Sequence, residues 1–74
     1  KTKDFTFVDA DLMEVLLELE ESYHVEIHTG SLELNDMRIT TTYREQSIDA
    51  ILETIGAAFG LTVSNREEGY YLTN

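Results

Sequence analysis

Apolar side chains recur at helical spacing in the stretch Ser47–Gly60. Spacings of i, i+3, i+4, i+7 and i+11 place them on one face of an α-helix. Ser47 is suited to cap the start of this helix, and Gly60 follows its last apolar position, where a left-handed residue commonly ends a helix. We therefore predict an amphipathic helix whose buried face consists of Ile48, Ile51, Leu52, Ile55 and Phe59.

The same pattern occurs 36 positions earlier, in Asp11–His24. Asp11 matches Ser47 as the capping residue, and the match extends into the flanking strands, where Phe7 takes the place of Tyr43. We infer that the chain consists of two copies of one strand–helix–strand unit. The other matched apolar pairs are Leu12 and Ile48, Val15 and Ile51, Leu16 and Leu52, Leu19 and Ile55, Tyr23 and Phe59, Val25 and Leu61, and Ile27 and Val63.

Strand patterns on either side of the helices indicate an α+β domain over residues 1–74, in the order β-α-β-β-α-β-β, with both helices packed against small sheets. The first βαβ unit spans residues 5–28 and the second spans residues 38–65. A hairpin at 66–69 leads to a final strand over residues 70–73, which has no counterpart in the first unit.

The final strand is a candidate partner interface because a terminal strand is expected at a sheet edge, where its backbone can pair with another chain. Tyr70 and Leu72 lie on one face of it, and Tyr71 and Thr73 lie on the other. Alternatively, at least one of the two tyrosines closes the core.

Met13 and Leu17 form a second candidate interface, since this i, i+4 pair lies outside the buried face of the first helix. Their counterparts in the second copy are Asp49 and Glu53, so both apolar side chains should be partly exposed if the two helices meet the core alike. We favour the alternative, a wider buried arc on the first helix under the loop around residues 31–35, over an interface role. Glu14, Glu18 and Glu21 form an acidic stripe on the same helix, which we interpret as a solvated face rather than a partner-binding stripe.

The net charge of −10 limits the partners that the domain can have. A phosphate backbone or an anionic lipid surface would be repelled, so we expect neither nucleic acid nor a membrane surface as a partner. A basic protein is compatible with this charge, and so is plain solubility. No apolar run approaches the length of about 20 residues that crosses a bilayer. The chain begins at Lys1 rather than Met, so we expect a domain cut from a longer protein.

Candidate chemistry is sparse. His24, Glu26 and His28 alternate along a predicted strand and could face one way, as zinc ligands do, but the chain has no further His and no Cys to complete a shell. An exposed strand face explains them better. No nucleophile elbow, phosphate loop or metalloprotease motif is present. The sequence therefore predicts a binding module without cofactor, metal or catalytic residues.

Several apolar positions together resemble a known family. The first unit reads Phe-x-x-Ala-x-Leu-x-x-Val-Leu-x-x-Leu-Glu-x-x-Tyr from Phe7 to Tyr23 and continues to Val25 and Ile27. Arg-Ile-Thr-Thr-Thr-Tyr then follows at 38–43, Ser-Ile-x-x-Ile-Leu at 47–52 and Tyr-x-Leu at 70–72. This pattern resembles the C-terminal domain of FecR-type anti-sigma regulators, which is similar to the short N-terminal signalling domain of TonB-dependent receptors and to secretin N-domains. His24 departs from it, because the family often has Gly or Asn there.

The resemblance implies a periplasmic domain of an inner-membrane protein, joined through one membrane helix to a cytoplasmic segment that controls an extracytoplasmic-function sigma factor. The domain would contact the signalling domain of a TonB-dependent receptor. Two alternatives remain open: the signalling domain of such a receptor itself, and a secretin-like ring module that self-assembles. A chain that finishes one residue after its last strand favours the regulator over the receptor.

Overall fold

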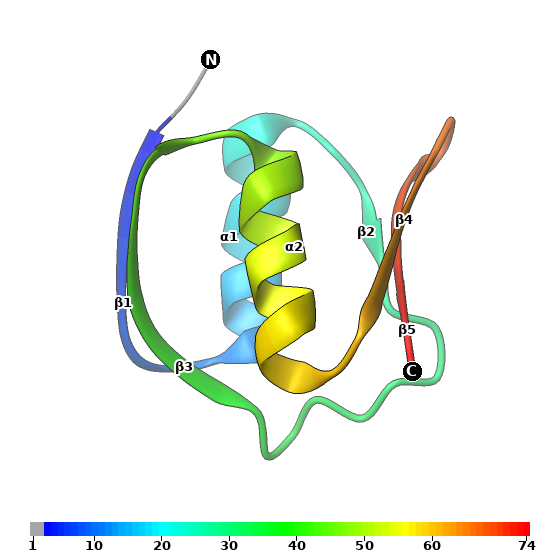
Figure 1. Ribbon diagram of the computed structural model, residues 1–74, viewed down its shortest axis with the longest axis horizontal. Helices are drawn as coiled ribbons and strands as arrows, with labels where there is room; N and C mark the ends of the chain where they lie inside the picture. Colours follow the sequence, from blue (N-terminus) through cyan, green and yellow to red (C-terminus); the bar gives the residue numbers. More distant parts are fainter. Residues whose placement is uncertain (1–2) are drawn as a thin grey trace.

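The computed structural model describes residues 3–74, and it contains the seven elements in the predicted order (Figure 1). The bounds are β1 Lys3–Asp11, α1 Leu12–Tyr23, β2 Ile27–His28, β3 Arg38–Gln46, α2 Ile48–Phe59, β4 Thr62–Arg66 and β5 Gly69–Thr73. The α+β class and the β-α-β-β-α-β-β order are thus confirmed. The strands β1 and β3 pair from Lys3 with Gln46 to Asp11 with Arg38, up to the starts of the two helices.

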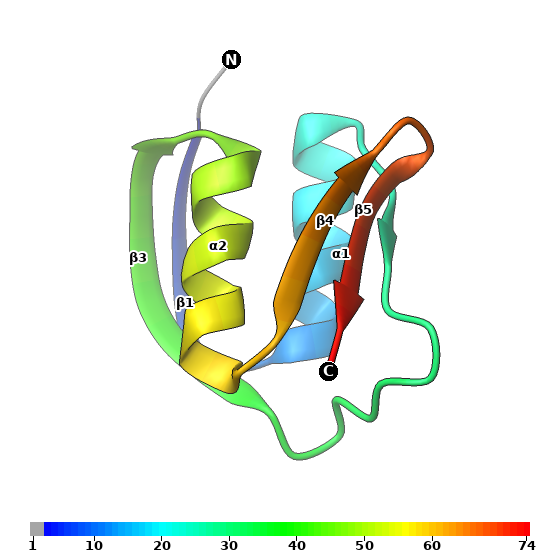
Figure 2. The ribbon, with the colours of Figure 1, turned by 45° about the vertical axis from the view of Figure 1, so that its right-hand side comes forward.

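The elements form three layers, with the two helices between two small sheets (Figures 1 and 2). One outer layer is the antiparallel pair β1–β3, and the other is a three-stranded sheet in the order β2-β5-β4. The helices run in opposite directions in the middle layer (Figure 2). Their predicted apolar faces pack against the sheets, with Leu12, Val15, Leu19, Ile51, Leu52 and Ile55 fully enclosed and Tyr23, Ile48 and Phe59 only partly buried.

The two copies correspond residue by residue at the helices. Both helices have 12 residues, and both end at a left-handed residue, His24 or Gly60, whose N–H donates to the helix. Ser47 caps α2 as predicted, because its Oγ accepts from the N–H of Ala50 at 3.2 Å. Asp11 precedes α1 without a side-chain cap, since its carboxylate instead accepts from Arg38 Nη1 at 2.7 Å.

The repeat also explains two strained positions in the β1–β3 pair. Asp9 and Glu45 both have positive φ, at 48° and 51°, and they lie 36 residues apart. The N–H of Asp9 donates to Thr40 Oγ1 at 2.8 Å, and the N–H of Glu45 donates to Asp4 Oδ1 at 3.0 Å. Asp4 and Thr40 are also 36 residues apart. Each copy therefore supplies the side chain that holds the bulge of the other copy, which makes β1–β3 a symmetric joint between the units.

The final strand does not lie where we predicted. β5 is the central strand of its sheet, parallel to β2 on one side and antiparallel to β4 on the other, so the predicted edge position is wrong. The edge strands are β2 and β4, which are matching elements of the two units. β5 thus joins the two copies by pairing with one strand of each.

Candidate partner-binding surface

The residues of β5 contribute mainly to packing. Tyr70 and Leu72 face the helices and are buried, as the alternative reading of the sequence expected of at least one tyrosine. Tyr71 is half-buried on the outer face of the sheet, and Thr73 is exposed. Strand addition alongside Tyr70 and Tyr71 is excluded, because β2 and β4 already pair with them.

One side of β5 opens beyond Tyr71, because β2 ends at His28. A pocket of about 560 Å³ lies there, between the last residues of β5 and the loop that leaves β2. Its lining residues are His28, Thr29, Gly30, Ser31, Leu32, Glu33, Met37, Tyr71, Leu72, Thr73 and Asn74. Leu72 and Thr73 are therefore the part of the predicted strand-addition site whose backbone lies beyond the end of β2.

Met13 and Leu17 are exposed on α1, so the wider buried arc that we favoured is wrong, and the exposure that the second copy indicated is found. Their exposed fractions are 45% and 54%, and the loop around residues 31–35 does not cover them. Val8, on the outer face of β1, is the other large apolar side chain that the described residues expose. On α2 the positions that match Met13 and Leu17 carry Asp49 and Glu53, both exposed, so the fold itself does not require apolar residues there.

Acidic side chains lie next to Leu17. Glu14 and Glu21 are its neighbours one turn before and one turn after it on the helix surface, Glu18 lies further round the helix, and all three are exposed. A shallow hollow of about 510 Å³ is lined by these residues together with Leu17, Glu20 and Ser22. All three glutamates are exposed, which agrees with the predicted solvated face.

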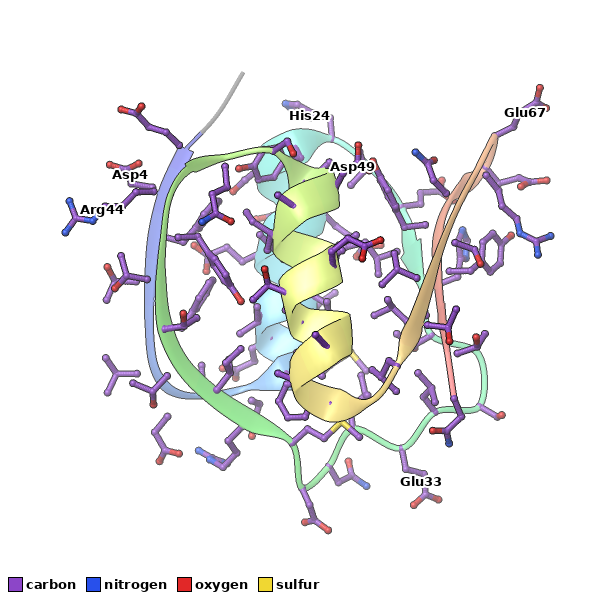
Figure 3. The ribbon with its side chains drawn as sticks, viewed as in Figure 1. Asp4, His24, Glu33, Arg44, Asp49 and Glu67 are labelled. Atoms are coloured by element: carbon purple, nitrogen blue, oxygen red, sulfur yellow. The ribbon has the colours of Figure 1, made fainter. Side chains whose placement is uncertain are left out.

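The three potential zinc ligands do not come together as a set. His24 is the C-cap of α1, where its backbone is left-handed (Figure 3). His28 stacks on Tyr71 with ring centroids 4.5 Å apart, and its Nε2 lies 3.2 Å from Glu26 Oε1. The guanidinium of Arg66 lies 5.3 Å from the Tyr71 ring centroid. Within residues 3–74, no group of three or more His, Asp or Glu side chains is arranged to hold a metal ion.

Two polar contacts of the fold involve carboxylates. Arg38 pairs with Asp9 at 2.8 Å and with Asp11 at 2.7 Å, and the hydrogen bond and charge of Asp9, with the charge of Asp11, raise the pKa of the guanidinium. Asp49 lies at the start of α2 (Figure 3), where it acts on the hydroxyl of Tyr70. A hydrogen bond with Asp49, burial and the negative charge of Asp49 raise the pKa of Tyr70 to about 12.

Both helices of the described chain are too short and too polar to cross a lipid bilayer.

Comparison with known proteins identifies the family. The sequence profile of the FecR C-terminal family matches residues 4–72. Two crystal structures of a candidate anti-sigma factor from Parabacteroides distasonis share the fold, each with a TM-score of 0.86 and 22% identity. Each alignment covers 99% of this chain and 34% of that chain, so the domain spans about a third of the length of that protein. No curated protein is significantly similar to the chain in sequence. Since the profile extends from β1 to β5, the chain belongs to the FecR C-terminal family.

Proposed function

We propose that this domain is the periplasmic, signal-receiving domain of a transmembrane anti-sigma regulator. In this role it binds the signalling domain of a TonB-dependent outer-membrane receptor, and the rest of the regulator relays the signal through a membrane helix to a cytoplasmic segment that acts on a sigma factor. The family match over residues 4–72 is the observation that carries this proposal. The fold shared with a candidate anti-sigma factor supports it.

The mechanism is binding without chemistry. The described residues offer exposed apolar side chains on one helix and an open stretch of strand backbone, and both are features of protein–protein contact. The exposed face of α1 around Met13 and Leu17 is the contact we favour, because apolar residues occupy it where α2 has acids. The −10 charge steers the domain toward a partner of opposite charge.

Leu17→Glu tests the contact in a background that should stay folded, since α2 carries Glu53 at the matching position. Ala57→Glu is the matched control, because it adds the same charge to the exposed face of α2, at the position that matches Glu21. Titration calorimetry against the signalling domain of the cognate receptor should show that Leu17→Glu lowers the affinity by about tenfold or more and that the control changes it little. Equal affinities for both variants would exclude the α1 face, and no binding by the wild type would contradict the proposed role.

The open end of β5 gives a second contact that can be tested separately. The N–H of Tyr70 donates toward β2, to the Glu26 carbonyl at 2.8 Å. Backbone N–H groups alternate in direction along a strand, so the N–H of Asn74 points to the same side as that of Tyr70. Opposite Asn74, that side has no paired strand among the described residues. Asn74→Pro removes this donor. We expect its affinity for the receptor domain to stay within about twofold of the wild type, whereas a loss of about tenfold would show that the partner adds a strand there.

The two alternative roles, a receptor signalling domain and a self-assembling ring module, can each be recognised by a different observation. A receptor signalling domain would be followed by plug and barrel sequence in the full-length protein. A ring module would self-associate, which the whole-molecule charge opposes.

A further inference from the structure

The exposed face of α1 combines one apolar side chain with three carboxylates. Leu17 is 54% exposed, and Glu14, Glu18 and Glu21 lie at i−3, i+1 and i+4 relative to it. On a helix, the i−3 and i+4 spacings make Glu14 and Glu21 surface neighbours of Leu17, and Glu18 belongs to the same acidic row because it lies four residues after Glu14 and three before Glu21. The hollow of about 510 Å³ at this point is lined by Leu17 and by these glutamates.

Among the described side chains, these carboxylates have no ion-pair partner. The ion pairs that the described side chains form involve Glu26, Asp9 and Asp11, none of which belongs to α1. α1 itself contains no Lys or Arg. A fourth glutamate of the helix, Glu20, differs in this respect, because its Oε2 accepts from the N–H of Ile27 at 2.7 Å. Glu20 therefore has a tertiary hydrogen bond that the described structure does not give to the other three.

The matching face of α2 has the reverse arrangement. Glu53 takes the position of Leu17, and Ala50, Thr54 and Ala57 take the positions of the three glutamates. Both helices otherwise share length, C-cap geometry and buried face, so folding does not explain why only α1 has an exposed apolar residue next to a row of acids. The difference therefore indicates binding on one side of the molecule.

We propose that the α1 face binds a partner segment through a Lys or Arg side chain whose aliphatic stem lies over Leu17 and whose charged end pairs with Glu14, Glu18 and Glu21. Long basic side chains combine an apolar stem with a cationic end, which suits this surface. A second copy of the domain is a poor occupant, because two such faces would repel each other. This inference rests on the proposed receiving role and specifies the chemistry of the partner.

The test uses the 74-residue chain, labelled with ¹⁵N, and two synthetic peptides. One peptide alternates arginine with leucine, and the other has citrulline, which keeps the shape and lacks the charge, in place of arginine. We expect the arginine peptide to shift the amide signals of α1 near Leu17 and to bind about tenfold more tightly than the citrulline peptide. Equal binding of the two peptides, or no binding of the arginine peptide, would overturn the inference.

A pair of charge reversals locates the contact. Glu18→Lys and Glu53→Lys make the same change on opposite helices, and each places the lysine four residues after an acid, Glu14 or Asp49, which favours a folded helix. Glu18→Lys should lower the affinity for the arginine peptide by about tenfold, and Glu53→Lys should lower it by less than about twofold. An equal loss in both variants would mean a general attraction to an acidic chain and would contradict a site on α1.

The receptor domain separates this inference from the proposed function. If the arginine peptide binds on α1 and the receptor domain does not bind at all, the proposed function fails and the chemistry of the site stands. If the receptor domain binds and Glu18→Lys affects it no more than Glu53→Lys, the receiving role stands and the site on α1 is wrong.

Discussion

At the scale of single residues, matching positions in the two copies can be compared to predict the effect of a substitution. His24 and Gly60 end the two helices in the same left-handed conformation, with φ of 56° and 71°. Histidine has a Cβ that disfavours this region, whereas glycine adopts it freely. The side chain of His24 is exposed, so the backbone conformation dominates its effect on stability.

His24→Gly should therefore raise the free energy of unfolding by roughly 0.5 to 1 kcal/mol. Gly60→Ala is the reverse change and should lower it by about 1 kcal/mol, since no atom lies within 4 Å of the new Cβ and only the backbone is affected. Urea denaturation measures both. A destabilised His24→Gly would show that the imidazole makes a contact important for folding.

Tyr70 should make stability depend on alkaline pH. Its folded pKa is about 12, raised by the hydrogen bond to Asp49, by burial and by the charge of Asp49, and its ordinary value is about 10. The folded state thus holds the proton more tightly than the unfolded state. The resulting stabilisation is complete below about pH 10 and is lost as the pH rises toward 12.

In urea titrations, Tyr70→Phe should lose less stability than the wild type between about pH 10 and pH 12, because the phenylalanine at position 70 has no proton to release. Asp49→Asn should shift the profile part of the way in the same direction. If the wild type and Tyr70→Phe lose stability in parallel, the pair with Asp49 does not act on the phenol.

At the scale of elements, close packing of α2 against the chain that follows it depends on one glycine. A Cβ on Gly56 would lie 2.8 Å from the carbonyl oxygen of Leu61 and 3.1 Å from Val63 Cγ2. The backbone N–H of Leu61 donates to the Gly56 carbonyl at 2.8 Å, so the backbone here has little freedom to move away. Ala57 and Ala58, which follow Gly56 in the helix, are exposed.

Gly56→Ala should lower the free energy of unfolding by about 1 to 3 kcal/mol, although alanine favours a helix by about 1 kcal/mol over glycine. Ala57→Gly is the control in the same helix and should cost only the propensity difference of about 1 kcal/mol. Thermal or urea unfolding distinguishes them. A more stable Gly56→Ala variant would mean that β4 can shift to accept the methyl group.

At the scale of the whole molecule, charge opposes self-assembly. Fifteen acids against five basic residues occupy a surface of 4831 Å². Charged side chains point outward from several elements, including Asp4, Glu33 and Glu67 (Figure 3). A molecule of this charge repels its own copies most strongly at low ionic strength, where screening extends over about 30 Å.

Light scattering at high protein concentration and low salt should therefore report a monomer. Added salt tests the cause, since a weak tendency to associate would increase when the repulsion is screened. A stable ring or larger assembly at low salt would contradict the receiving role and favour a self-assembling module.

Much of this architecture follows from local patterns. Helical spacing identifies the apolar faces of α1 and α2, the 36-residue repeat predicts their equivalence, and cap residues mark where they end. Comparison of the copies also indicated that Met13 and Leu17 would be exposed if both helices meet the core alike, and they are. Helix faces and caps depend on neighbours within one or two helical turns, and the repeat is found by aligning two stretches of the chain, so the sequence alone is enough for both.

Strand neighbours, by contrast, were decided only by the tertiary structure. Alternation along β5 shows which side chains face the core, but it does not show which strands lie on either side. β5 becomes central because β2 and β4, far apart in the chain, both pair with it, and this moves the accessible backbone to the residues after Tyr71. Likewise, the crossed hydrogen bonds of Asp4 and Thr40 form only when β1 meets β3. The sequence by itself determined the elements and their buried faces, and tertiary pairing determined which surfaces remain open, because pairing depends on contacts between distant segments.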